Sequence, residues 1–155
     1  MSTHHDTALM TVEALVLRRR RPLVAVLPFD GGADDDAALR MLATEAADLL
    51  RDRLASSPDI GSILISSDFL ARAPDHALEL ICRQLRVGYL ISGMCYRFGA
   101  STSLYIELAD TRGWHVVWAE FLKGNAPDLL DPCGATMADV LQGLRQALRH
   151  HQSAS

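Results

Sequence analysis

Residues 21–32, RPLVAVLPFDGG, decide the fold of this chain. A run of arginines gives way to five apolar residues, LVAVL, and these are followed by Pro28, Phe29 and a diglycine. A short continuous apolar run between turn residues is typical of a strand that is covered on both faces, because a strand with one solvated face alternates apolar and polar residues. The stretch therefore predicts the first and central strand of an α/β sheet.

The residues after this strand predict a helix and a second strand. Asp34, Asp35 and Asp36 precede a segment up to residue 55 in which leucines recur at helical spacing, and acidic residues at a helix start cap its free amides. Residues 62–66 then form a short strand. A strand, a helix and a strand make a right-handed crossover, so the two strands are expected to be parallel.

The rest of the chain predicts a mixed sheet. A helix over residues 74–85 leads to a third, parallel strand, and tight turns then connect two further strands in an antiparallel meander. These three strands cover residues 89–97, 103–110 and 114–123, and a last helix covers residues 135–148. The predicted fold is a three-layer α/β/α arrangement with a five-stranded sheet of order 2-1-3-4-5, in which strand four is antiparallel to the rest.

Length and composition indicate one domain. The chain has 155 residues, of which 49% are hydrophobic. A chain of this size and composition can bury a core without stabilisation by a metal ion or disulfide bonds. We expect an amphipathic helix and basic linker at residues 1–21, a single domain at residues 22–150 and a disordered tail at residues 151–155. The first segment is a packing linker in one interpretation and a dimerising element in another.

Charge and cysteine content exclude several classes of function. A net charge of −4 and a pI near 5.8 argue against direct nucleic-acid binding. No apolar run approaches the roughly 18 to 20 residues of a spanning helix, so no membrane association is expected. Three cysteines without C-x-x-C spacing favour neither a disulfide framework nor a zinc site, and they predict a cytoplasmic location.

The polar clusters predict no catalysis. Asp30 and the three aspartates that follow it lack the spacing of a calcium loop, so capping explains them better than metal binding. The residue types of a hydrolase triad occur at Ser66, Ser67, Asp68, His76 and His115, but no G-x-S-x-G motif accompanies them. We therefore expect a protein that is not an enzyme, with no cofactor and no metal site.

A crevice beyond the first and third strands is the candidate binding site. Helices leave the sheet on opposite faces there, and open α/β sheets bind ligands at such a point. The expected lining is Pro28, Phe29 and Asp30 on one side and Ser92 and Gly93 on the other. Two interpretations stay open: Phe29 offers apolar area to a ligand, or Phe29 fills the crevice and belongs to the core.

Five motifs in order resemble the TolB amino-terminal-domain-like module. They are VAVLPF at residues 24–29, Thr44-Glu45, LRVGYLISG at residues 85–93, LYIELAD at residues 104–110 and VWAE at residues 117–120. Ala43 and Ser92 depart from the usual glycine and acidic residue of the family pattern. The resemblance covers roughly residues 22–124 and implies the same strand and helix order as the hydrophobic pattern.

The resemblance also implies a function. Such modules accompany bacterial class III adenylate cyclases, winged-helix transcription regulators and tetratricopeptide-repeat proteins. It therefore implies a non-enzymatic regulatory or protein-interaction module of a bacterial signalling or transcription-control protein, with a protein partner or a fused signalling domain. The alternative is a small-molecule sensor with its ligand in the crevice. The edge of the fifth strand, which carries few charges, and the amino-terminal segment further predict a homodimer.

Overall fold

The computed structural model describes residues 21–32, 36–73 and 75–154. One mixed sheet runs through the molecule with the strand order β2-β1-β3-β4-β5. Strand β1 pairs in parallel with β2 and β3, and β4 is antiparallel to both of its neighbours, so the predicted order and directions are confirmed. The strands are β1 (Leu23–Val26), β2 (Gly61–Leu64), β3 (Tyr89–Phe98), β4 (Ser101–Asp110) and β5 (His115–Gly124).

Strand β1 lies at the centre and is covered on both faces, as its continuous apolar run predicts. Val24 and Val26 belong to the larger hydrophobic core, Ala25 belongs to a second core on the other face, and all three have no exposed surface. The larger core packs against α2 (Ala37–Ala55), whose N-cap is Asp36. The Asp36 carboxylate accepts a hydrogen bond from the Leu39 amide at 3.0 Å, which confirms the predicted cap.

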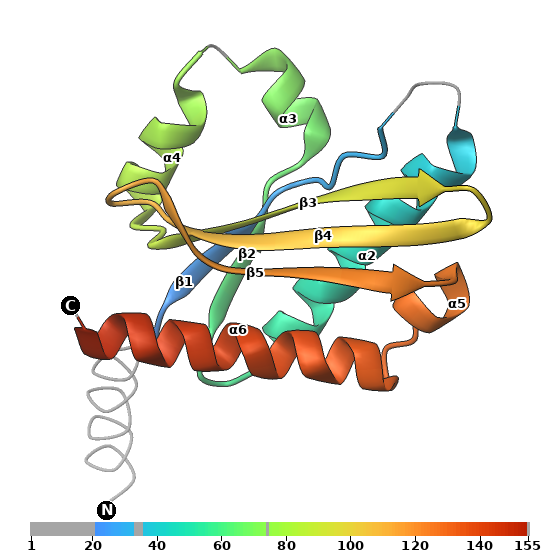
Figure 1. The fold of residues 1–155 in the computed structure, drawn as a ribbon. Helices are drawn as coiled ribbons and strands as arrows, with labels where there is room; N and C mark the ends of the chain where they lie inside the picture. The colour runs from blue at the N-terminus through green and yellow to red at the C-terminus, as the bar shows by residue number, and fades with distance from the viewer. Residues whose placement is uncertain (1–20, 33–35, 74, 155) are drawn as a thin grey trace, which may run out of the picture.

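Helices cover the two faces of the sheet unequally (Figure 1). Helices α2 and α6 (Ala135–Ala154) pack on one face, where their apolar side chains meet those of all three long strands. On the other face, α3 (Ser67–Arg72) and α4 (Ala77–Leu85) pack over β1, β2 and the start of β3. Among the described residues, the second core includes no side chain of β4 or β5. We call the part of this face formed by Met94, Tyr96, Phe98, Tyr105 and Phe121 the open face.

Three elements differ from the sequence prediction. Helix α4 corresponds to the helix predicted over residues 74–85, but a further helix, α3, precedes it and is capped by Ser66. A short helix α5 (Ala126–Leu129) follows β5. Helix α6 continues to Ala154, past the predicted end at residue 148 and through most of the expected disordered tail.

The predicted amino-terminal helix and basic linker lie, except for Arg21, outside the described residues. No helix in the described part of the chain is both long enough and apolar enough to span a membrane.

Candidate functional site

The residues of the predicted crevice lie together, but Phe29 occupies the space between them. The Asp30 amide donates to the Gly93 carbonyl at 3.0 Å, and the Cys95 amide donates to the Asp30 carbonyl at 2.8 Å, so the segment after β1 continues alongside β3. A Cβ atom added at Gly93 would lie 2.8 Å from the Phe29 ring. Phe29 is 7% exposed and belongs to the larger core, which fits the second of the two interpretations.

The other residues of the predicted crevice differ from one another in exposure and in hydrogen-bond partners. Asp30 is exposed, and its carboxylate accepts a hydrogen bond from the Gly32 amide at 2.9 Å. Pro28 is half-buried. The Ser92 hydroxyl donates to Glu107 on the neighbouring strand at 3.3 Å. Gly93 and Phe29 therefore share a packing contact, while Ser92 lies on the opposite face of the sheet.

The open face carries aromatic side chains in register across three strands. Met94 of β3 lies opposite Tyr105 of β4, and Tyr105 lies opposite Phe121 of β5, so these side chains form a row on one face. The Tyr96 ring lies 6.1 Å from both the Phe98 and the Phe121 rings, and the Tyr105 ring lies 6.5 Å from that of Phe121. The row therefore forms one connected aromatic surface.

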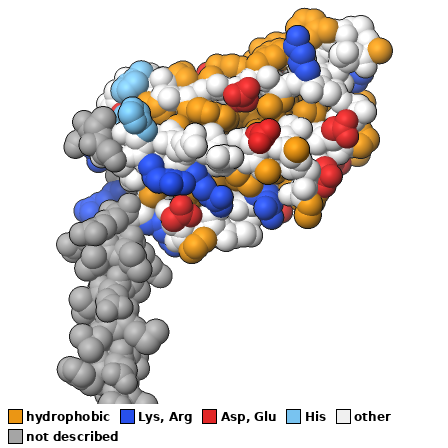
Figure 2. Space-filling model, turned by 60° about the horizontal axis from the view of Figure 1, so that its bottom comes forward, with side chains coloured by type: hydrophobic (Ala, Val, Ile, Leu, Met, Phe, Trp, Pro, Cys, Tyr) orange, Lys and Arg blue, Asp and Glu red, His pale blue; other side chains and the backbone are white. Residues whose placement is uncertain are grey.

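Much of this surface is open to solvent. Phe98 is 61% exposed and Phe121 is 44% exposed. Figure 2 shows the molecule from the side of α6, opposite the open face, with hydrophobic side chains along the upper edge of the view. Glu107 is the acidic neighbour of the row, and it accepts hydrogen bonds from Ser92 and, at 2.8 Å, from the Tyr105 hydroxyl. The bond from Tyr105 to Glu107 raises the pKa of Tyr105, so its hydroxyl stays protonated and remains a donor on this face.

A second group of polar side chains lies at the other end of the long strands. Tyr89 of β3 is the register partner of Asp110 of β4, and Asp110 is the partner of His115 of β5, so the three residues form a row across the sheet. The last turns of α6 cross this row and add His151. The Tyr89 hydroxyl and His151 Nδ1 are 2.8 Å apart, and His151 Nε2 lies 3.4 Å from Asp110 Oδ2.

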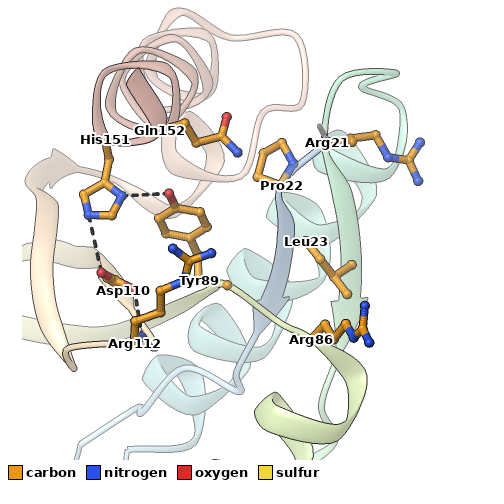
Figure 3. Close-up of a pocket in the computed structure, with 10 residues that line it drawn as sticks. Arg21, Pro22, Leu23, Arg86, Tyr89, Asp110, Arg112, His151 and Gln152 are labelled. Atoms are coloured by element: carbon orange, nitrogen blue, oxygen red, sulfur yellow. Dashed lines mark hydrogen bonds and ion pairs between the residues drawn. The ribbon is translucent and has the colours of Figure 1, made fainter. Parts of the chain in front are cut away.

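Part of this group lines a pocket of about 380 Å³. Figure 3 shows the hydroxyl of Tyr89, the imidazole of His151 and the carboxylate of Asp110 in one connected chain at its wall. Three arginines are among the other lining residues, and two of them, Arg21 and Arg86, extend away from this chain (Figure 3). The pocket therefore combines a carboxylate and an imidazole with three arginine residues.

The connected chain does not supply an activated nucleophile. Burial raises the pKa of the Tyr89 hydroxyl, the nearby Asp110 carboxylate raises it further, and Arg112 lowers it only in part. A tyrosine must lose its proton to act as a nucleophile, and these surroundings favour the protonated form. His151, Asp110 and His115 offer nitrogen and oxygen atoms that could bind an ion.

Reasoning from the sequence alone included His115 only as a possible triad member and missed His151. A signal was present, because His151 lies three residues after Leu148 and seven after Leu144, on the face of α6 whose leucines are buried. Of the two tryptophans, Trp118 packs against the core, whereas Trp114 is 46% exposed in a turn.

Comparison with known proteins identifies the fold and no family. No protein-family model and no curated protein sequence matches the chain. Among solved structures, a PelC dodecamer from Paraburkholderia phytofirmans matches with a TM-score of 0.54 at 18% identity, over 81% of this chain and 90% of that one. TolB from Acinetobacter baumannii matches with a TM-score of 0.54 at 16% identity, over 83% of this chain and 28% of TolB. Protein XCC0632 from Xanthomonas campestris matches with a TM-score of 0.51 at 12% identity, over 87% and 90% of the two chains.

These structures confirm a TolB-like fold and correct two expectations drawn from the resemblance. These neighbours point to the bacterial envelope and not to cytoplasmic signalling or transcription-control proteins. The predicted role in bacterial signalling or transcription control and the predicted cytoplasmic location are therefore wrong. The Phe29 ring also lies in the crevice in which the alternative, a small-molecule sensor, places its ligand.

Proposed function

We propose that this chain is a non-catalytic assembly domain that forms homo-oligomers through the open face. The observation that carries the proposal is the row of partly exposed aromatic side chains on β3, β4 and β5, which no described helix covers. Water in contact with such a surface is released when a second surface covers it, and this release drives association. Aromatic residues are also enriched in the cores of protein interfaces.

The composition of the open face suits a second copy of the same chain. Its side chains are mainly apolar, and Glu107, which accepts a hydrogen bond from the Tyr105 hydroxyl, adds a polar group beside them. A stable interface has this arrangement, with an apolar core inside a polar rim and roughly 800 Å² buried on each partner. The PelC structure, which shares the fold, is a dodecamer, and this supports self-association as the use of the surface.

The edge of β5 is a weaker candidate for the same contact. The strand forms one edge of the sheet, and Val116 is 49% exposed there. Glu120 and Lys123 also lie on it and are exposed, and charged side chains on an edge strand hinder pairing with another strand. We therefore assign the interface to the aromatic face of the strands rather than to their free edge.

Light scattering across a concentration series tests the proposal. We expect the wild-type chain to form a defined oligomer in the micromolar range and Phe121→Glu to shift it towards the monomer, because a charge would lie in the apolar centre of the contact. Met41→Glu is the matched control, since Met41 is 64% exposed on α2, on the covered side of the sheet. A wild-type monomer at high micromolar concentration, or an equal effect of both substitutions, would contradict the proposal.

A further inference from the structure

Three potential metal ligands converge where β4, β5 and the end of α6 meet. One ligand atom from each of Asp110, His115 and His151 lies within 4.8 Å of the other two. Asp110 Oδ2 lies 3.4 Å from His151 Nε2 and 3.9 Å from His115 Nε2. Ligands of a tetrahedral zinc ion lie about 3.3 Å apart, given bonds of about 2.0 Å. The spacing of the first pair already matches this geometry, and the second needs only a small movement of His115.

The Asp110 carboxylate is oriented for one metal bond. Its Oδ1 atom accepts a hydrogen bond from the Arg112 amide at 2.8 Å, so Oδ2 is the atom that faces both histidines. The side chain is only 8% exposed, which reduces the competition of water for this oxygen. The backbone and the burial together hold Oδ2 in place before any ion binds.

His151 has a hydrogen-bond partner for the ring nitrogen that would not bind the metal, as metal-bound histidines almost always do. Its Nδ1 atom lies 2.8 Å from the Tyr89 hydroxyl, and the two rings meet edge to face at 5.5 Å. When Nε2 binds a metal, the ring proton resides on Nδ1, and the hydroxyl oxygen of Tyr89 can accept the hydrogen bond from it. The same contact therefore fixes the ring orientation and leaves the Nε2 lone pair directed at Asp110.

The turn before β5 places His115 at the third position. Trp114 adopts a left-handed conformation with a φ of 54°, which is unfavourable for a residue with a side chain. A Cβ atom at Gly113 would lie 2.7 Å from His115 Nδ1, so the imidazole occupies space that only a glycine leaves free. A bulge between Leu108 and Ala109 shifts the register of β4 against β5 next to this turn, and bulges commonly redirect side chains beside functional sites.

We propose that Asp110, His115 and His151 form a binding site for a divalent transition-metal ion, with zinc as the ion that fits best. Two imidazoles and one carboxylate suit zinc, and three protein ligands leave a fourth position for water or an exogenous ligand. Arg112 extends towards Tyr89 at this wall of the pocket, so an exogenous ligand at the fourth position would be an anion (Figure 3). The ion would also tie the end of α6 to the turn between β4 and β5.

Zinc titration of histidine variants tests the site. The full chain, prepared without an affinity tag and stripped with a chelator, would be titrated with zinc chloride by calorimetry and with Co²⁺ by visible absorption. We expect one tight site per chain and a strong absorption band typical of four-coordinate Co²⁺. His115→Gln and His151→Gln should each weaken zinc binding at least tenfold. His150→Gln is the matched control, because His150 is exposed on the same helix and should stay within twofold of wild type.

Two further variants distinguish ligation by these three side chains from nonspecific zinc binding elsewhere on the surface. Gly113→Ala keeps all three ligands but displaces the His115 ring, so it should weaken zinc binding while the far-ultraviolet circular dichroism is unchanged. Tyr89→Phe removes the hydroxyl that contacts His151 Nδ1, and it should weaken zinc binding roughly tenfold or more. All variants keep His4 and His5, so any binding at that pair is common to the series. Equal zinc affinities for His115→Gln, His151→Gln and His150→Gln, or no zinc binding by the wild-type chain, would overturn the site.

Discussion

Truncation of Phe29 should destabilise the domain strongly, because the ring is a core element that fills the space beyond β1. Phe29 is 7% exposed, and its ring lies directly over Gly93. Phe29→Ala should reduce the free energy of unfolding by about 3 to 5 kcal/mol, the usual result of replacing a buried aromatic by alanine. Urea unfolding followed by tryptophan fluorescence measures this loss. A midpoint shift at constant slope identifies it as a change in stability.

A double-mutant cycle makes this test specific to the Phe29–Gly93 contact. Gly93→Ala places a Cβ atom 2.8 to 2.9 Å from three ring atoms, which is too close, and it should cost about 1 to 3 kcal/mol. In the Phe29→Ala background the same methyl group enters the vacated space, so its cost should largely disappear. The resulting coupling should be on the order of 1 to 3 kcal/mol. Additive effects, or a loss under about 1 kcal/mol for Phe29→Ala alone, would refute the assignment of Phe29 to the core.

Two further predictions concern the centre of the sheet and the start of α2. Val26→Asp should prevent folding, as judged by circular dichroism, because it buries an unpaired charge at a side chain with no exposed surface. Asp36→Asn should lower the melting temperature near neutral pH: the hydrogen bond from Arg97 and that from the Leu39 amide hold the Asp36 pKa below its usual value. This contribution is complete above the unfolded carboxyl pKa of about 4 and is lost as pH falls through the folded pKa, so the two melting curves should converge in acid.

The sheet was predictable from the sequence because its signals are local. A continuous apolar run identifies β1 as a strand covered on both faces, and the alternation of turns and apolar segments gives the order of the others. Handedness of the crossovers then places α2 and α4 on opposite faces without further information. The two short helices α3 and α5 were missed, since four to six residues are too few for a hydrophobic period to emerge.

The sites were harder to predict because they depend on contacts between distant segments. Phe29 has the same sequence pattern whether it binds a ligand or fills the core, and only its position over Gly93 decides between the two. His151 stands in a polar carboxyl-terminal stretch, and its role depends on helix α6 continuing past Leu148 to reach Asp110.

The exposure of the open face could not be predicted from the sequence either. Its aromatic residues alternate along the strands as buried residues would, and the sequence does not show that α3 and α4 stop short of them. A strand with two apolar faces normally predicts cover on both. Here the cover on one face is missing among the described elements, and the proposed second copy would supply it.

Photo-crosslinking at the open face tests self-association there most directly. Benzoylphenylalanine in place of Phe121 would lie within the proposed contact, whereas the same amino acid in place of Met41 would lie on the outer surface of α2. We predict covalent dimers on irradiation of the Phe121 variant, with crosslinks that map to residues of the open face on the second copy, and no dimers from the Met41 variant. Dimers from both variants, or from neither at concentrations where light scattering finds oligomers, would contradict the assignment.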